Sequence, residues 1–272
     1  MVTQQDTQVS PAGRYEVDSV RRTLKLMRAL VERGSLTLEQ AVPIVGSAKS
    51  TTFRLLETLR AADWVERAPR DGYQLGPEAV RWSLVLFGRL DIPAVAAEEV
   101  RSLWLRTGET VGLALFTGRT IVLTEILESP DPFRMAEVPG TLAPPHSSAL
   151  GRAVSAYLPE AELMELLGPE PYKKLAARSP GSFKELKLLL EEVVKSGCAI
   201  EIEESALGVA CVAGPIFQLG KVRGGISVAG PRVRMTDKRL AELGPVVAEA
   251  ARRISARLSP GAPHQPPLSA LP

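Results

Sequence analysis

Hydrophobic residues in the first quarter of the chain recur at the spacing of amphipathic helices, and two short runs with the alternation of β-strands follow. Gly46 separates the second helical run from the third, and an Asp-Gly pair at residues 71–72 marks the turn between the strands. Three helices followed by a hairpin are typical of a winged helix-turn-helix domain. The expected elements are helices at residues 17–31, 35–45 (capped near Ser35 or Thr37) and 49–61, and strands at residues 64–67 and 73–75.

Residues 76–106 again have a helical pattern, interrupted at residues 91–93. This pattern predicts a helical linker between two domains. The apolar residues at positions 84–87, from Leu84 to Phe87, exceed what a solvated linker needs. They are therefore a candidate for contact with a second subunit, and packing on the linker's own domain is the alternative.

Strands and helices are mixed beyond Gly108. A hairpin is predicted over residues 110–127, around a turn at residues 117–119. The other expected elements are helices at residues 147–156, 160–167, 183–196 and 236–258, and strands at residues 198–203, 209–217 and 222–229. We therefore expect an α+β protein whose C-terminal half is a mixed antiparallel sheet flanked by helices, with a ligand pocket on one face.

Composition places the chain among ordinary globular proteins, because 45% of its 272 residues are hydrophobic and 24% are charged. No apolar run approaches the roughly 20 residues that span a bilayer, and the first residues lack the apolar core of a secretion signal. Two cysteines, Cys198 and Cys211, suit a reducing compartment. We expect a cytoplasmic protein without a membrane partner, and disordered tails at residues 1–16 and 259–272.

Positive charge is concentrated near the N-terminus. Residues 17–90 hold twelve Lys or Arg against eight Asp or Glu, a net charge of +4, whereas the whole chain carries only +2. A basic segment is the electrostatic footprint of a nucleic-acid-binding module. A chance fluctuation on a solvated surface is the alternative reading of the charge alone.

The third predicted helix has one apolar face and one short polar face. Thr52, Leu56 and Leu59 fall together, whereas Ser50 and Arg54 fall opposite. A recognition helix presents such an end to the DNA major groove, because its N-terminal residues reach the base edges. An amphipathic surface helix is the alternative. We expect DNA contacts from residues of this helix and of the hairpin turn: Lys49, Ser50, Thr51, Arg54, Arg67 and Arg70.

Longer motifs resemble one known family. The segments KSTTFRLLETLRAADWVER, PPHSSALGRAVSAYLP, EIEESALGVACVAGPIF and GGISVAGPRVRMT occur in the order found in the IclR family of bacterial transcription factors. The resemblance implies a winged helix-turn-helix domain (residues 17–76), a helical linker (77–106) and a GAF-like effector-binding domain (107–258). It also implies a double-stranded DNA operator, a repressor or activator that forms a homodimer or dimer of dimers, and effectors that are small organic acids or aromatic compounds.

Three positions depart from the family's usual pattern. Pro43 falls within the second helix, where it predicts a shortened or kinked end. Ala48 stands where a proline is common, and Phe53 stands where a smaller or more polar residue is usual. The base contacts near Phe53 are therefore expected to differ from those of other members.

The resemblance also indicates where an effector binds. Serine hydroxyls and the amides at the start of the helix near residue 147 would be donors for a carboxylate. Ala229 replaces a second serine that is frequent in carboxylate-binding members, and Phe133 and Met135 lie near in the motif order, so a partly apolar ligand is expected. The positions carried over by motif are Ser148, Ala149, Leu150, Glu201, Cys211, Ser227 and Ala229.

Catalysis has little support in the sequence. Cys211 and His146 are a conceivable nucleophile and base, but no third residue that would orient them is indicated. The chain has no phosphate-binding glycine loop and no paired His or Cys motif, so neither a cofactor nor a metal is expected. A DNA-binding architectural protein without a ligand remains the alternative to an effector-responsive regulator.

Overall fold

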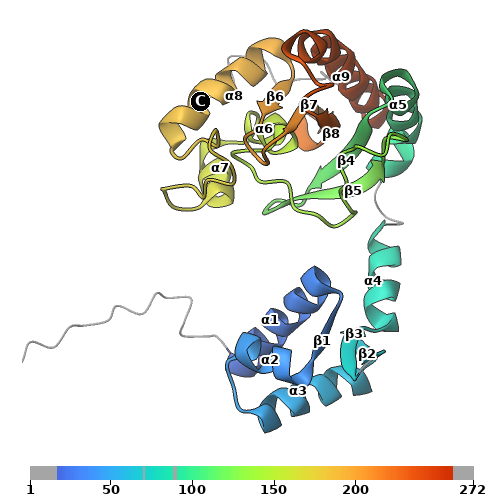
Figure 1. Ribbon diagram of the computed structural model, residues 1–272, viewed down its shortest axis with the longest axis vertical. Helices are drawn as coiled ribbons and strands as arrows, with labels where there is room; N and C mark the ends of the chain where they lie inside the picture. The colour runs from blue at the N-terminus through green and yellow to red at the C-terminus, as the bar shows by residue number, and fades with distance from the viewer. Residues whose placement is uncertain (1–16, 70, 88–90, 260–272) are drawn as a thin grey trace, which may run out of the picture. The chain divides into compact units, whose positions relative to one another are not determined.

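The computed structural model describes residues 17–69, 71–87 and 91–259. The chain divides between residues 90 and 91 into two compact units (Figure 1). The first unit contains α1 (Asp18–Arg33), β1 (Ser35–Thr37), α2 (Leu38–Val45), α3 (Lys49–Ala61), β2 (Val65–Ala68), β3 (Gly72–Leu75) and α4 (Pro77–Phe87).

The core of the first unit lies between its first three helices and a small sheet. Leu26, Leu30 and Leu56 are fully buried there. The sheet has the order β1-β3-β2, and both pairs are antiparallel. The predicted cap at Thr37 is confirmed, whereas the alternative start at Ser35 is wrong, because residues 35–37 form the unpredicted strand β1. They pair with β3, and Thr37 then caps α2 by accepting a hydrogen bond from Gln40 N at 3.3 Å.

Pro43 does not shorten α2, because the helix continues through it to Val45, which is the end expected from the sequence. The carbonyl group that loses its N–H partner belongs to Glu39. Glu39 and Pro43 are both exposed, so water can reach that carbonyl. The helix ends at Gly46, whose left-handed backbone (φ 67°) favours glycine.

The second unit is a five-stranded antiparallel sheet covered by helices. The strands have the order β5-β4-β8-β7-β6. Its elements are α5 (Asp91–Thr107), β4 (Thr110–Phe116), β5 (Ile121–Leu127), α6 (Ala149–Ser155), α7 (Glu160–Leu167), α8 (Phe183–Ser196), β6 (Ala199–Ile202), β7 (Val209–Gln218), β8 (Lys221–Pro231) and α9 (Asp237–Leu258).

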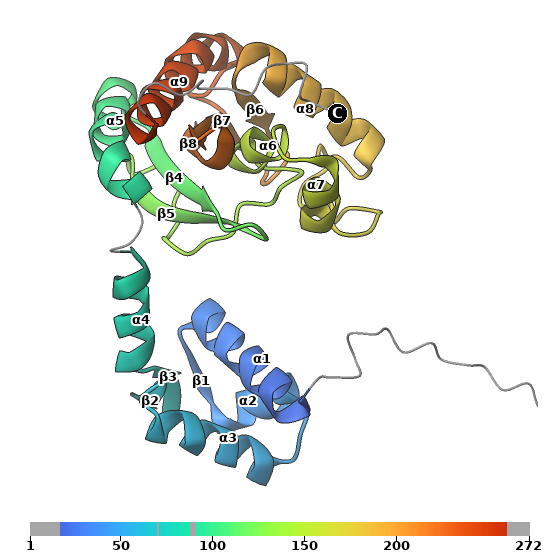
Figure 2. The ribbon, with the colours of Figure 1, turned by 180° about the vertical axis from the view of Figure 1, so that it is seen from behind.

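Strand alternation separates two cores on the faces of this sheet. Val111, Leu113 and Val228 point to the face that α5 and α9 cover. Ala114 and Cys211 point to the opposite face, where α6 and α8 pack. Figure 2 shows the two groups of helices on either side of the sheet. Within the described residues, no helix is long and apolar enough to cross a membrane.

Candidate functional site

The first turns of α3 form a short polar surface. Ser50, Thr51 and Arg54 are exposed, whereas Thr52 and Leu56 are fully buried. The Arg54 guanidinium forms no hydrogen bond or ion pair with any residue that the structure describes. The helix therefore presents two hydroxyls and one uncommitted cation to solvent, which is the chemistry that reads base edges.

The other cations proposed from sequence are arranged differently. Lys49 Nζ lies 2.7 Å from Glu39 Oε1, in an exposed ion pair that is easily exchanged for another anion. Arg67 lies on β2, next to the turn of the wing. Arg70 lies outside the described residues.

Arg67 is held by an aromatic ring and a carboxylate. Its guanidinium carbon lies 4.2 Å from the centre of the Tyr73 ring, and its Nη2 lies 3.3 Å from Glu57 Oε1. Glu57 also pairs with Arg60, and this hydrogen bond lowers the pKa of the Glu57 carboxyl. Glu57 therefore connects α3 to the wing and fixes the position of Arg67.

All seven residues proposed for an effector line one cavity of about 60 Å³ in the second unit. Phe133 does not line it and is 64% exposed. The remaining lining comes from β5, from β7 and from the loops at residues 135–144 and 205, and consists of Leu123, Met135, Glu137, Leu142, Ala143, Pro144, Ser205 and Val209.

The register of the sheet explains why distant residues meet at this cavity. Glu201 on β6 pairs with Cys211 on β7, and Cys211 pairs with Ala229 on β8. Residues directly opposite in neighbouring strands point to the same face. Ser227 lies two residues from Ala229 along β8, so it points to that face as well.

The start of α6 closes the cavity from above the sheet. The Ser148 hydroxyl accepts a hydrogen bond from Gly151 N at 2.9 Å and donates one to Pro144 O at 2.8 Å. A Cβ atom on Gly151 would overlap the Pro144 carbonyl. Glycine at position 151 therefore allows α6 to pack closely against the preceding loop, which places Ala149 and Leu150 at the cavity wall.

Two carboxylates dominate the electrostatics of the cavity. Glu201 is 2% exposed, and its Oε1 accepts hydrogen bonds from Ser205 N at 2.9 Å and Ser205 Oγ at 2.6 Å. Burial raises the pKa of Glu201. Burial and then the charge of Glu201 raise the pKa of Glu137. The sequence interpretation missed Glu137, which lies in a loop without any periodic pattern that would mark it.

A buried arginine supports the wall behind Glu201, and it was not foreseen either. Arg152 on α6 is 1% exposed. Its guanidinium forms an ion pair with Glu204 and donates a hydrogen bond to the Ile200 carbonyl. The only sequence signal for this role is an arginine within an otherwise apolar helix. The ion pair connects α6 to the segment that follows β6.

The conceivable nucleophile and base are not assembled. Burial, and secondarily the charges of nearby carboxylates, raise the pKa of Cys211 well above its usual value, so its thiol stays protonated at neutral pH. His146 uses Nε2 to contact Lys173 O at 2.9 Å and forms no hydrogen bond with Cys211. No group of three metal-ligating side chains occurs within the described ranges.

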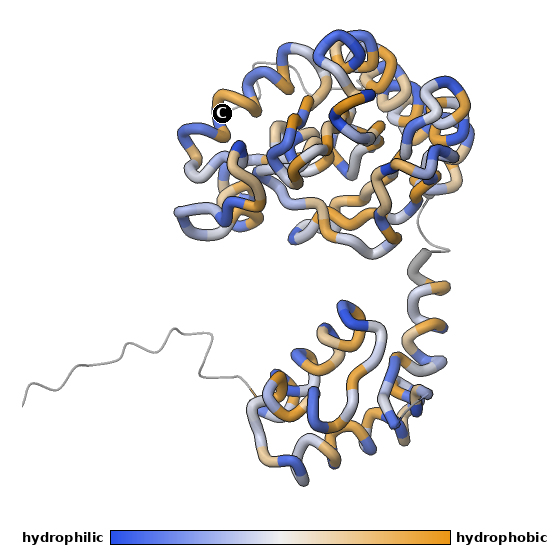
Figure 3. Tube along the Cα trace, in the orientation of Figure 1, coloured by the Kyte–Doolittle hydropathy of each residue, from blue (hydrophilic) through white to orange (hydrophobic). Residues whose placement is uncertain are grey.

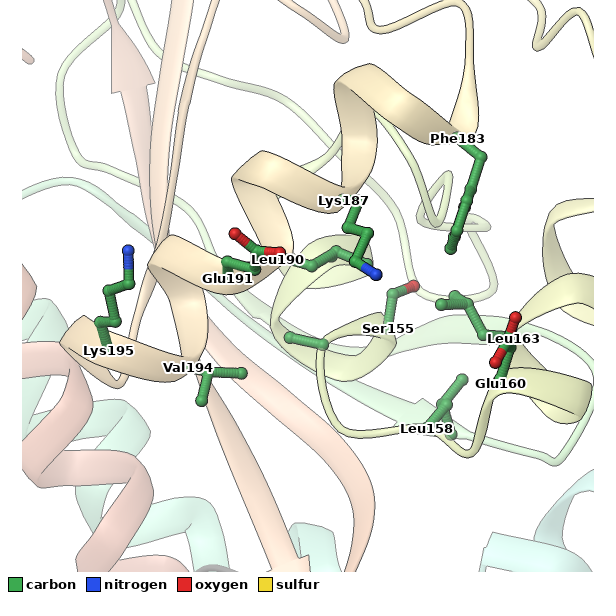
Figure 4. Close-up of a pocket in the computed structure, with 11 residues that line it drawn as sticks. Ser155, Leu158, Glu160, Leu163, Phe183, Lys187, Leu190, Glu191, Val194 and Lys195 are labelled. Atoms are coloured by element: carbon green, nitrogen blue, oxygen red, sulfur yellow. The ribbon is translucent and has the colours of Figure 1, made fainter. Parts of the chain in front are cut away.

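A second hollow, of about 380 Å³, lies between α8 and the α6–α7 segment. Figure 4 shows Lys187 and Phe183 on one side of it and Leu163 and Glu160 on the other. None of the residues proposed from sequence lines this hollow. The proposed effector residues thus converge on the smaller cavity at the sheet.

Two known domain families match the chain. Residues 19–69 match the IclR helix-turn-helix domain, and residues 85–256 match the family described as bacterial transcriptional regulator IclR C-terminal. The second match alone covers more than half of the chain. The two matches fall on either side of β3 and the first part of α4.

Full-length relatives agree with this assignment. The HTH-type transcriptional regulator BhcR of Paracoccus denitrificans is 30% identical over 252 residues, which are 90% of this chain and 88% of the relative. The HTH-type transcriptional repressor AllR of Escherichia coli K12 is 29% identical over 259 residues, with coverages of 92% and 94%.

A solved IclR homologue from Microbacterium hydrocarbonoxydans, complexed with 4-hydroxybenzoate, has the same fold. Its TM-score is 0.73 at 20% identity, over 88% of this chain and 98% of the homologue. The family to which these regulators belong is one of DNA-binding proteins rather than of enzymes. The chain thus belongs to the IclR family of bacterial transcriptional regulators, with an N-terminal helix-turn-helix DNA-binding domain and a C-terminal effector-binding domain.

Proposed function

We propose that this protein is a cytoplasmic repressor whose affinity for a double-stranded DNA operator changes when a small molecule occupies the cavity in the second unit. The name of E. coli AllR, a repressor, supports the direction of regulation. We assign DNA binding to residues 17–76 and effector binding to residues 107–258. Residues 77–106 connect them, and the part of this connection in α5 packs on the sheet of the second unit. We place the protein in the cytoplasm because the operator DNA is located there.

The exposed polar surface at the start of α3 carries the proposed DNA contact. Ser50, Thr51 and Arg54 read base edges in the major groove, because they are exposed and Arg54 has no described partner. Lys49 and Arg67 contact phosphates or the minor groove on either side. Arg70 takes the same role in this proposal, although it lies outside the described residues.

Arg54→Ala is expected to weaken binding to the operator by about 1–3 kcal/mol, because a bidentate contact to a base is lost. Binding to unrelated DNA should change little, since the other phosphate contacts remain. Fluorescence anisotropy with the operator and with a scrambled duplex measures both affinities.

Arg33→Ala is the matched control for this substitution. Arg33 is also exposed and without a described partner, but it lies in the last turn of α1. Its loss removes the same charge from the domain and should reduce operator affinity much less. Equal operator affinity for Arg54→Ala and the unmodified protein would contradict the assigned recognition surface.

The effector proposal is supported by the convergence of the seven motif positions on one cavity. A chain with only an architectural role in DNA binding has no need of a cavity lined by buried polar side chains such as Glu201 and Ser227. The Microbacterium homologue complexed with 4-hydroxybenzoate shows a small organic molecule on this fold in that protein. The same use of the fold here is our proposal.

We further propose a homodimer, or a dimer of dimers, built through the first unit. Val20, Leu24 and Val31 are 55%, 64% and 63% exposed and lie along one side of α1. On α4, Leu84 is 68% exposed. Figure 3 shows hydrophobic positions recurring along both helices. The side chains of residues 86 and 87, also proposed from sequence, lie outside the described set.

Leu24→Glu is expected to weaken self-association by at least about 100-fold, because a two-fold dimer loses the burial of two leucines at roughly 1.5–3 kcal/mol each. Sedimentation velocity at micromolar concentration measures the effect. Leu207→Glu is the control, since Leu207 is 85% exposed in a loop of the second unit. A monomeric unmodified protein at that concentration, with and without DNA, would refute the dimer.

A further inference from the structure

Two of the three serine hydroxyls that line the effector cavity donate their protons to the protein. Ser205 Oγ donates to Glu201 Oε1 at 2.6 Å, and Ser148 Oγ donates to Pro144 O at 2.8 Å. The Ser227 hydroxyl makes only a long contact of 3.5 Å with Gly112 O. Ser205 and Ser148 therefore offer a ligand lone pairs rather than protons.

The carboxylates of the cavity have spare acceptor capacity. Both hydrogen bonds to Glu201 end on Oε1, and Oε2 accepts none from the described residues. Glu137 forms no hydrogen bond or ion pair with the part of the chain that the structure describes. Because Glu201 is almost completely buried, the acceptor capacity left on it can be met only from within the cavity.

No cation of the protein balances these two carboxylates within the cavity wall. The described lining contains neither lysine nor arginine nor histidine. Burial raises the pKa of Glu201, and the positive charge of Arg152 offsets this only in part, because its guanidinium is bound to Glu204 and to the Ile200 carbonyl outside the wall. Two carboxylates that line one cavity, with a nearby arginine that is already paired to a third carboxylate, favour a positively charged guest, which would lower their raised pKa values.

We propose that the effector cavity takes a small organic cation, an alkylammonium group whose N–H donors bind the Glu137 and Glu201 carboxylates while its short carbon chain packs on Leu123 and Leu142. This inference rests on the proposed effector function of the same cavity. It differs from the acid or aromatic effector that the family resemblance implies. An acid would add negative charge beside the buried Glu201 and the half-buried Glu137 carboxyl groups.

Size limits the ligand further. At roughly 10–15 Å³ for each water-sized occupant, the cavity of about 60 Å³ holds about four to six non-hydrogen atoms. Butylamine, butan-1-ol and butyrate all fall in this range, share one carbon skeleton, and differ in charge. They are therefore matched probes for a cationic, a neutral and an anionic guest. Butyrate also tests the first-turn amides of α6, the feature of this wall that favours an anion.

Calorimetric titration of the full-length protein with the three probes at neutral pH tests the proposal. Butylamine is expected to bind at least about tenfold more tightly than butan-1-ol or butyrate, because hydrogen bonds to ionised partners are the stronger ones. Tighter binding of butyrate or butan-1-ol, or no binding of butylamine, would overturn the proposal that the cavity binds a cation. Neither result would contradict the proposed DNA contact of α3, because the operator titration with Arg54→Ala tests that contact separately.

Two variants test whether the cation binds inside the cavity. Glu137→Gln removes one charge, and Glu201→Gln does so while leaving a carbonyl oxygen that accepts the Ser205 hydrogen bonds. Each should reduce butylamine affinity by about tenfold and leave butan-1-ol unaffected. Glu125→Gln is the control, because Glu125 is another partly buried carboxyl with a raised pKa that does not line the cavity. An equal loss in all three variants, or none in the first two, would overturn the site.

Discussion

Replacing Arg152 with methionine is expected to lower the free energy of unfolding of the second unit by about 3–5 kcal/mol, because it leaves a buried carboxylate without its partner. Arg152 is 1% exposed and the Glu204 side chain is 12% exposed. The Ile200 carbonyl would also lose its donor. Methionine keeps much of the apolar stem of arginine. The decrease in the free energy of unfolding therefore reflects the lost charge and hydrogen bonds rather than a large void.

Differential scanning calorimetry measures this loss, and for a domain of this size it corresponds to a transition about 6–20 °C lower. Arg119→Met is the matched control, since the Arg119 and Glu165 side chains are 82% and 62% exposed and such pairs contribute little. The double variant Arg152→Met with Glu204→Met should recover much of the stability. A shift for Arg152→Met as small as that for Arg119→Met would contradict the structural role of the pair.

Replacing Cys211 with phenylalanine is expected to abolish the effector response while leaving DNA binding without effector unchanged within about twofold. Cys211 lies in the middle of the cavity floor, between Glu201 and Ala229 in the sheet register. Phenylalanine adds about five non-hydrogen atoms, which is about what the cavity holds. A ligand that loses its space should bind at least about 100-fold more weakly, and its coupling to DNA disappears with it.

The ligand for this measurement is the compound that raises the melting temperature most in a screen of small amines, alcohols and carboxylic acids. Operator affinity is then measured with and without that compound. Cys211→Ala is the control, because it removes the thiol but enlarges the space, and it should keep the response. A normal response in folded Cys211→Phe protein would place the effector elsewhere.

Local pattern was sufficient to predict most of the elements. The helix at residues 183–196 and the strands of the second unit have periodicities that leave few alternatives, and the structure has α8 and the strands there. β1 was missed because it has only three residues, the last of which is the capping Thr37, and so short a strand has no alternation to detect. The predicted end of α2 at residue 45 is confirmed, but the effect of Pro43 was misjudged, because its tolerance depends on solvent access to one carbonyl group, which only the fold determines.

The lining residues of the cavity were likewise predicted only in part. The family resemblance identified one wall, because the motif positions Glu201, Cys211 and Ala229 lie opposite one another on neighbouring strands. Glu137 could not be found in this way, because a loop residue reaches the cavity only through tertiary packing. The charge balance of the cavity depends on Glu137 and Arg152 together. The sign of the charge on the preferred ligand can therefore be inferred from the structure but not from the motifs.

Selection of genomic fragments from the source organism by the full-length protein is the most direct test of an effector-responsive, sequence-specific regulator. We predict enrichment of a few fragments that share an inverted repeat with half-sites about one helical turn apart or a multiple of it. The affinity for them should change about 5–150-fold when the compound from the melting screen is added. Uniform recovery of the genome, with an affinity that no such compound changes, would contradict the account.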